Sequence, residues 1–358
     1  MTSEALTRAW SEVADHYNDH HPDTVLFVAN HALSRTDLTS AEIIEIGSEA
    51  VQFRVKSDGG EPAIESFTLP QPLTRLEGLA QTLIGLLHQA RQAAPEGVPL
   101  TSIEVEFAKT ASLATHTVTV KTVTDINAHL REITFFDIGE LQPPGGDAFM
   151  FLFVPNPGEA LPAGYDMARW RGEPADERLG GAYYTIRRSR PDEVDMWFVL
   201  HETWGAVSAW AGSAQPGDQV AMWGPRVGFE PPDGTRQYVL LADETALAAV
   251  AAVLDELPAD VAVTTIAEVN STADHVPLRQ EPGWNLHWVY RNGAEPGTSD
   301  AMLQTLQTLP VPPTEGLYVF GAAEASQIGS VRSHVRQAWS PDRGSIHLTG
   351  YWRRGVSK

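Results

Sequence analysis

Residues 181–188 read Gly-Ala-Tyr-Tyr-Thr-Ile-Arg-Arg and form one of a series of short β-type segments. A tyrosine ring can wall a flat ligand, and a neighbouring hydroxyl can hydrogen-bond it. Turn-forming clusters separate the segments, which cover residues 103–107, 115–123, 131–136, 148–154, 183–187, 196–201 and 219–223. This spacing predicts an antiparallel β-barrel or sandwich over residues 99–232.

The pattern changes after Pro231, where strand-like and helix-like segments alternate. Expected strands lie at residues 238–242, 261–269, 286–290 and 316–320, and expected helices at residues 245–256, 300–308 and 323–339. Such alternation is typical of a parallel sheet covered by helices. We therefore expect a compact parallel α/β domain over residues 233–358.

The first 98 residues are expected to form an α+β accessory module. A mixed helix over residues 3–32 should break or restart at Pro22, because proline cannot continue a hydrogen-bonded helix. Residues 43–55 alternate like strands, and residues 73–94 carry apolar side chains at helical spacing. A Pro/Gly-rich stretch at residues 95–99 marks a linker, so three domains are predicted, at residues 1–98, 99–232 and 233–358.

The composition excludes several classes of function. A net charge of −21, from 25 basic and 46 acidic side chains, repels nucleic acid and anionic membranes. The chain has no cysteine, so thiolate metal sites, iron–sulfur clusters and disulfides are excluded. No apolar run reaches the length of a membrane span. We expect a cytoplasmic protein that neither inserts into membranes nor binds nucleic acid.

Ordered segments along residues 102–358 resemble the siderophore-interacting protein family, whose members are FAD- and NAD(P)H-dependent ferric-siderophore reductases. The segments are Gly-Asp-Ala-Phe (146–149), Tyr-Thr-Ile-Arg-Arg (184–188), Phe-Val-Leu-His (198–201), Trp-Ala (210–211), Pro-Gly-Asp (216–218), Gly-Pro-Arg (224–226), Asp-Glu-Thr-Ala-Leu (243–247), Ala-Glu (323–324) and Gly-Tyr-Trp-Arg-Arg-Gly (350–355). The resemblance implies a flavin-binding barrel followed by a nucleotide-binding domain.

The resemblance also implies which residues meet each ligand. In the family the Tyr184 and Thr185 positions contact the flavin ring, and the turn before a helix holds the FAD diphosphate. The residues expected to contact FAD or a nicotinamide dinucleotide (NADPH or NADH) are Tyr184, Thr185, Ile186, Arg187, Val199, His201, Gly205, Ser208, Asp243, Thr245, Ala246, Glu324, Tyr351 and Trp352. Those expected to meet an anionic ferric chelate are Arg188, Arg226, Arg353 and Arg354. No residue is assigned to proton transfer, which the iron step does not require, and no metal site is expected.

Hydride would pass from the nicotinamide to the flavin, and electrons would then pass singly to ferric iron. The family's flavin-strand arginine is replaced by Ala182, and Glu202, Trp204 and Ala206 occupy the expected diphosphate turn. These replacements motivate an alternative, a flavin-free descendant that binds or converts another small molecule between the barrel and the α/β domain.

A second alternative concerns the N-terminal module. Its segment His-Tyr-Asn-Asp-His-His-Pro-Asp (16–23) is similar to the opening of the small domain of haem-utilisation proteins. His16, His20 and His21 could then contribute to a haem-related site, since His16 and His20 would share one helix face.

Overall fold

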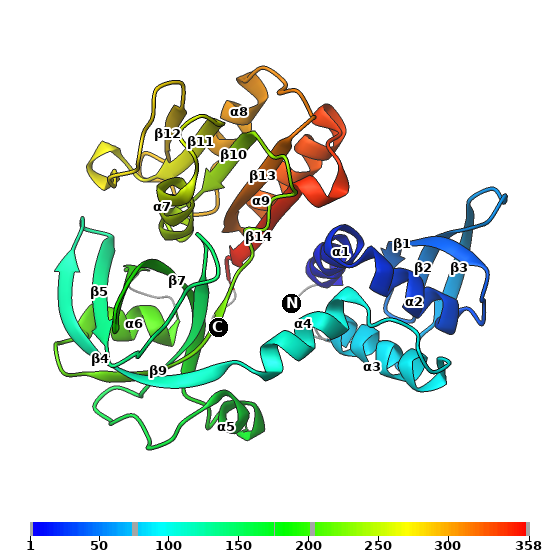
Figure 1. The fold of residues 1–358 in the computed structure, drawn as a ribbon, viewed down its shortest axis with the longest axis horizontal. Coiled ribbons are helices and arrows are strands. Elements are labelled where there is room, and N and C mark those ends of the chain that lie inside the picture. The colour runs from blue at the N-terminus through cyan, green and yellow to red at the C-terminus, as the bar shows by residue number, and fades with distance from the viewer. Residues whose placement is uncertain (1–2, 74–77, 175, 201–204, 356–358) are drawn as a thin grey trace. The chain divides into compact units, whose positions relative to one another are not determined.

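The computed structural model describes residues 3–73, 78–174, 176–200 and 205–355 (Figure 1). The chain divides into two compact units, residues 1–112 and 113–358, which are described separately below. Among the described residues, no helix has both the length and the apolar content needed to cross a membrane.

The first unit packs helices against a three-stranded antiparallel sheet of order β1-β2-β3. Pro22 occupies the first turn of the second helix, which confirms that the predicted long helix is interrupted there. Apolar side chains from all three layers, such as Trp10, Phe53 and Leu79, form one core. The elements are α1 (Ser3–His20), α2 (Pro22–Ala32), β1 (Leu38–Ile46), β2 (Ala50–Ser57), β3 (Ala63–Thr68), α3 (Gly78–Ala93) and α4 (Ser102–Ala111).

The predicted strand at residues 103–107 is wrong, because these residues belong to helix α4. The alternation of Ile103, Val105 and Phe107 with two glutamates resembles a strand, but only Ile103 is buried. Glu104 accepts a hydrogen bond from the backbone N–H of Thr101 at 2.8 Å, and this contact stabilises the first turn of a helix. Local capping therefore outweighs the period-two pattern.

The second unit begins with a closed antiparallel barrel of strand order β4-β5-β8-β7-β6-β9, which confirms the predicted barrel. The barrel interior is lined by alternate side chains of each strand, including Ile133, Met150 and Phe198. Its elements are β4 (Ala114–Asp125), β5 (Leu130–Phe136), β6 (Phe149–Val154), α5 (Met167–Gly172), β7 (Gly180–Arg190), β8 (Glu193–Val199), α6 (Ala206–Ser213) and β9 (Gln219–Arg226).

A five-stranded parallel sheet of order β12-β11-β10-β13-β14 follows, as the alternating pattern predicts. Helix α7 packs on one face, and α8 and α9 pack on the other. The strands are β10 (Gln237–Ala242), β11 (Ala262–Val269), β12 (Asn285–Tyr290), β13 (Leu317–Glu324) and β14 (Ile346–Trp352). The helices are α7 (Leu247–Glu256), α8 (Ala301–Thr308) and α9 (Ala325–His334), with 3₁₀ turns at Thr272–Asp274 and Arg343–Ser345 and a π-helical turn at Val335–Trp339.

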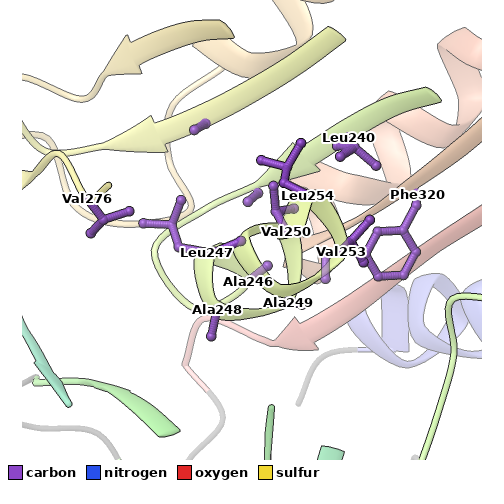
Figure 2. Close-up of a cluster of buried hydrophobic side chains, with 14 of the residues drawn as sticks. Leu240, Ala246, Leu247, Ala248, Ala249, Val250, Val253, Leu254, Val276 and Phe320 are labelled. Carbon is purple, nitrogen blue, oxygen red and sulfur yellow. The ribbon is translucent and has the colours of Figure 1, made fainter. Parts of the chain in front are cut away.

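Helix α7 lies at the centre of the core that the sheet shares with the barrel. Figure 2 shows its alanine and valine side chains packed between Leu240 and Phe320 of the sheet and Val276. All residues from Leu247 to Leu254 are buried, so this helix is covered on every side. Because the same core includes Trp197 and Val199 of strand β8, the barrel and the sheet are held together by apolar burial.

An ion pair between a buried arginine and a partly exposed aspartate adds a polar connection between the two parts of the second unit. Arg187 of β7 donates to Asp255 of α7 at 2.7 Å, and the exposed fractions of the two side chains are 3% and 44%. The guanidinium also lies over the ring of Trp197, 5.1 Å from its centroid. Arg187 therefore depends on Asp255 to balance a charge that water cannot reach.

We expect Asp255→Ala to lower the free energy of unfolding by about 3 kcal/mol, because it leaves the Arg187 charge buried without its partner. The matched control is Asp260→Ala, which breaks the exposed Arg236–Asp260 pair and should cost less than about 1 kcal/mol. Urea unfolding measures both values. Equal effects of the two substitutions would contradict a buried, structural role for Arg187.

Candidate functional site

Strand β7 pairs with β8 along only part of its length. Residues 180–185 pair with β6 on one edge, whereas the described pairing with β8 begins at Ile186. Over residues 197–199, strand β8 likewise pairs with β5. Within the described part of the barrel, the facing edges of β7 and β8 therefore do not pair with each other at this end.

Aromatic side chains lie at this open seam. The ring of Tyr184 stacks on that of Phe198, with 4.5 Å between centroids and an interplanar angle of 30°. Burial raises the pKa of the Tyr184 hydroxyl, so it stays neutral and can act as a hydrogen-bond donor. Tyr184 thus packs with Phe198 against the barrel core at this end of β7.

Helix α6 begins next to the same strand. Its N-cap is Gly205, whose φ of 60° is a left-handed conformation that glycine adopts without strain. A Cβ atom added to Gly180 would lie 2.2 Å from the Cβ of Ala206, so β7 and the start of α6 are in close contact. Ser208 donates to the carbonyl of Val199 at 2.8 Å and holds α6 against β8.

The segment at residues 350–355 reaches the barrel strand directly. The side chain of Thr185 lies close to the hydroxyl of Tyr351, and both residues are buried or half-buried. Burial raises the pKa of Tyr351, so this phenol also stays neutral. Two hydroxyl groups from opposite parts of the second unit are therefore brought together at the seam.

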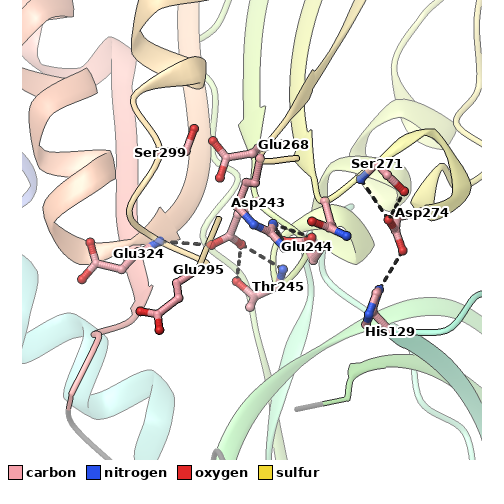
Figure 3. A network of polar contacts seen from close by, with 12 residues as sticks. His129, Asp243, Glu244, Thr245, Glu268, Ser271, Asp274, Glu295, Ser299 and Glu324 are labelled. Carbon is pink, nitrogen blue, oxygen red and sulfur yellow. Dashed lines mark hydrogen bonds and ion pairs between the residues drawn. The ribbon is translucent and has the colours of Figure 1, made fainter. Parts of the chain in front are cut away.

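Asp243, at the carboxyl end of β10, organises the edge of the sheet (Figure 3). Its carboxylate accepts hydrogen bonds from the backbone N–H and hydroxyl of Thr245, at 2.9 and 2.6 Å. It also accepts from the backbone N–H of Glu324 at 3.1 Å and from the indole of Trp352 at 2.7 Å. Burial raises the pKa of Asp243, while these donors favour the ionised form.

The first-turn donors of helix α9 are occupied by a second carboxylate. Glu324 caps the helix by accepting from the backbone N–H groups of Ser326 and Gln327, at 2.7 and 3.1 Å. Its other oxygen accepts from the backbone N–H of Arg354 at 3.3 Å. Glu324, which was expected to contact a dinucleotide, therefore accepts hydrogen bonds from backbone N–H groups of this chain. Through one of these bonds it joins residue 354 to the sheet.

Glu268 is a fully buried acid at the end of β11 that the sequence analysis did not select. It accepts from the Gln327 amide at 2.9 Å, while its Oε1 and the Gln327 Oε1 have no hydrogen-bond partner among the described residues. Burial raises the pKa of Glu268 to about 7. Protonation on Oε1 would turn this acceptor without a partner into a donor. An acid at the end of an apolar strand is the sequence signal that identifies this position.

Several predicted ligand contacts have other surroundings. Ile186 lies in the barrel core, Arg187 is in the Asp255 ion pair, and Ala246 is buried at the N-cap of α7. The side chain of Arg188 is exposed. Arg353 is half-buried and Arg354 is exposed, both beyond β14. His201, together with Glu202 and Trp204, lies outside the described residues.

Arg226 lies in an aromatic cluster on the outer face of the barrel. Its guanidinium is 5.5 Å from the ring centroid of Phe149 and 5.8 Å from that of Tyr183. Phe149 pairs with both Thr185 and Arg226 across the neighbouring strands, so these side chains share one face. Nearly half of Tyr183 is exposed. We call Phe149, Tyr183 and Arg226 the aromatic–arginine surface. The two rings were not predicted as functional.

The N-terminal histidines lie close together in the first unit. The ring centroids of His16 and His20 are 5.0 Å apart, and those of His16 and His21 are 5.2 Å apart. His21 contacts the hydroxyl of Ser102 through Nδ1 at 2.9 Å. A search of the described residues finds no group of three or more His, Asp or Glu side chains arranged to hold a metal ion. A haem-related role for these histidines stays a prediction.

Comparisons with known proteins cover the second unit. Residues 119–229 match the model of the siderophore-interacting FAD-binding domain, and residues 235–355 match that of the siderophore-interacting protein. A solved siderophore utilization protein from T. fusca is 30% identical, with a TM-score of 0.60, over 68% of this chain and 95% of that chain. The chain belongs to the siderophore-interacting protein family.

Other relatives agree with this assignment. The siderophore-interacting protein SipS from Aeromonas hydrophila is 27% identical, with a TM-score of 0.58, over 68% of this chain and 93% of that one. The ferric vibriobactin reductase ViuB of Vibrio cholerae is 28% identical over 49% of this chain and 65% of its own length. The first curated relatives match over 60% of their length. Both family models begin after the first unit, at residue 119 or later.

The seam between β7 and β8 has the chemistry that a flavin requires. Tyr184 supplies an aromatic ring, Thr185 and Tyr351 supply hydroxyls, and residues 180–185 have no partner strand on the β8 side among the described residues. The first turn of α6 contains no acidic residue, and no described side chain caps it, so its backbone N–H groups are candidates to meet a phosphate. These donors are neutral, because they are hydroxyl and backbone N–H groups, and the nearby Arg187 is paired with Asp255.

The raised pKa of Glu268 predicts a stability that falls as pH rises. The folded protein holds this proton up to a pKa of about 7, whereas the unfolded chain releases it near 4.5. Stability from the protonated acid is therefore complete below about pH 4.5 and is lost through about pH 7, by about 3 kcal/mol. We expect Glu268→Gln to remove this loss.

Urea unfolding at about pH 5 and about pH 8 tests the prediction as a difference between variant and wild type. Glu295→Gln, an exposed change at the same edge, is the control and should keep the wild-type pH dependence. A wild-type pH dependence in Glu268→Gln as well would show that Glu268 is not protonated in the folded protein.

Proposed function

We propose that the protein is a flavin-dependent oxidoreductase that uses NADH or NADPH to reduce a ferric siderophore or a similar iron chelate. The observation that carries the proposal is the contact between Thr185 and Tyr351 beside the unpaired edge of β7. It joins the flavin-type strand to the family's C-terminal segment at one position. The family assignment supports the same reading.

The chemistry divides between the cofactor and the chain. A bound FAD would accept two electrons from the dinucleotide and deliver them one at a time. One NAD(P)H oxidised to NAD(P)⁺ and a proton would thus reduce two ferric ions to ferrous ions. Tyr184 would cover the ring, and Thr185 and Tyr351 would hydrogen-bond its edge. The neutral hydroxyls add no charge that would oppose electron transfer to the iron chelate.

The aromatic–arginine surface is the part of the barrel that we assign to the chelate. It lies on the same face as Thr185, so a ligand resting on Phe149 and Tyr183 would be close to the proposed flavin edge. Arg226 supplies a positive charge in a chain whose net charge is −21. An anionic chelate with apolar or aromatic parts fits this combination. We further infer a cytoplasmic reaction, because nicotinamide dinucleotides are available there.

Titration of the purified protein with FAD tests the proposal. We expect saturable binding, bleaching of the flavin absorbance by NADH or NADPH without oxygen, and recovery of the absorbance when a ferric chelate is added. A ferrous-specific dye should then report two ferrous ions for each dinucleotide. Absence of flavin uptake would overturn the proposal and favour the flavin-free alternative.

We expect Arg226→Gln to raise the KM for an anionic ferric chelate up to about fivefold, because a partly exposed charge contact contributes about 1 kcal/mol or less. The KM for the dinucleotide should stay unchanged. Arg236→Gln is the control, since it removes the same charge from an exposed pair with Asp260. Equal chelate KM values for both variants would place the chelate elsewhere.

A further inference from the structure

The strand order identifies where a dinucleotide would be expected on the sheet. From β10 the chain proceeds outward through β11 and β12, and it then returns to β13 and β14 on the other side. Ligands of such sheets bind outside the carboxyl ends of the strands at this reversal. Here the reversal lies between β10, which ends beside Asp243, and β13, which ends at Glu324.

The indole of Trp352 lies at this same point. Its Nε1 donates to the Asp243 carboxylate at 2.7 Å, and Trp352 pairs with Glu324 in the register of β13 and β14. The loop between β12 and α8 packs on the ring. A Cβ added to Gly297 would lie 3.0 Å from Cη2 of Trp352 and 2.6 Å from Cγ of Glu324. The indole is thus held between the sheet edge and this loop.

Several backbone N–H groups that could meet a diphosphate here already have carboxylate partners. Asp243 accepts from the N–H of Thr245, which lies just before α7, and Glu324 accepts from the N–H groups of Ser326 and Gln327 in the first turn of α9. Arg291, the nearby cation, forms a buried ion pair with Glu244. Two carboxylates and an indole therefore occupy the position where a diphosphate would require N–H donors and positive charge.

We propose that Trp352 competes with the nicotinamide dinucleotide, and that the dinucleotide binds only after the indole has left Asp243. This inference rests on the proposed use of NADH or NADPH. Asp243 is then a positioning residue, because it holds the indole in the closed arrangement. Without Trp352 the carboxylate keeps its bonds from Thr245 and Glu324, so the sheet edge remains organised when the indole moves.

Trp352 is the element of this arrangement that can move at least cost. It is the last residue of β14, which is an edge strand and pairs with β13 alone in the described sheet. The register of β13 and β14 is also interrupted between Ala323 and Glu324, next to the Trp352 pairing. Strand ends at an edge open more readily than central strands, which have partners on both sides.

Calorimetric titration of the full-length protein with NAD⁺ and NADP⁺ tests the competition without turnover. We expect Trp352→Ala to bind at least one of them about tenfold more tightly than the wild type, which corresponds to about 1.4 kcal/mol. Trp352→Phe, which keeps a ring but loses the N–H, should show a smaller gain. The control is Trp284→Phe, whose indole donates to Val261 at 3.0 Å near the start of β11, and it should show none.

The outcomes separate the two proposals. Wild-type binding with no gain in Trp352→Ala would overturn the competition and leave the proposed function standing. Absence of binding in every variant would overturn the use of a dinucleotide and the competition with it. Hydrogen exchange of the wild type is a second measurement. Saturating NAD⁺ should speed exchange of the Arg354 amide, which now donates to Glu324. Slower exchange of that amide would contradict displacement of this segment.

Discussion

The buried carboxylate of Asp243 is the constraint on which the functional edge of the protein depends. A carboxyl group that is 3% exposed needs several hydrogen-bond donors, and Asp243 obtains them from the Thr245 turn, the end of β13 and the indole of Trp352. Three segments that are distant in sequence must therefore converge on one pair of oxygen atoms. With Trp352 fixed in this way, Tyr351 lies where it reaches Thr185 on the barrel strand.

This convergence explains how the chain can lack family features and keep the family fold. The loss of an arginine at Ala182 removes a charge from the barrel strand, yet the hydrophobic core shared by α7, the sheet and β8 does not involve that position. The Arg187–Asp255 pair and the Thr185–Tyr351 contact join the barrel to the sheet independently. The barrel and the sheet are thus joined by apolar packing and by the Arg187–Asp255 ion pair, and neither involves Ala182.

The sequence was sufficient to predict the architecture where apolar residues repeat at the spacing of a strand or a helix over a whole element. The barrel strands, the strand–helix alternation after Pro231 and the break at Pro22 all follow from local patterns, and the structure confirms them. Residues 103–107 were misread because three apolar residues of a helix alternate with two glutamates. The deciding contact there, Glu104 with Thr101, is a side-chain interaction that a hydropathy pattern does not report.

The motifs at residues 184–188 and 350–355 correctly indicated two segments that meet at the seam, since Thr185 and Tyr351 lie close together. The side-chain contacts between residues that are distant in sequence could not be predicted. Nothing in the sequence pairs Arg187 with Asp255, 68 residues away, or places Gly297 against Trp352. Such contacts depend on the tertiary packing of helices and loops against the sheet. The positions assigned by resemblance to dinucleotide binding, Asp243 and Glu324, instead bind the chain's own amides, because an isolated motif does not reveal which ligand satisfies a buried acid.

The central claim is that the unpaired edge of β7 and the C-terminal segment together form the flavin site. Hydrogen exchange of the full-length protein, measured with and without excess FAD, tests it most directly. The account predicts slower exchange of backbone amides in residues 181–185, at the start of α6 and at residue 351. Flavin binding that left all of these amides unchanged, or that slowed exchange only in the first unit, would contradict it.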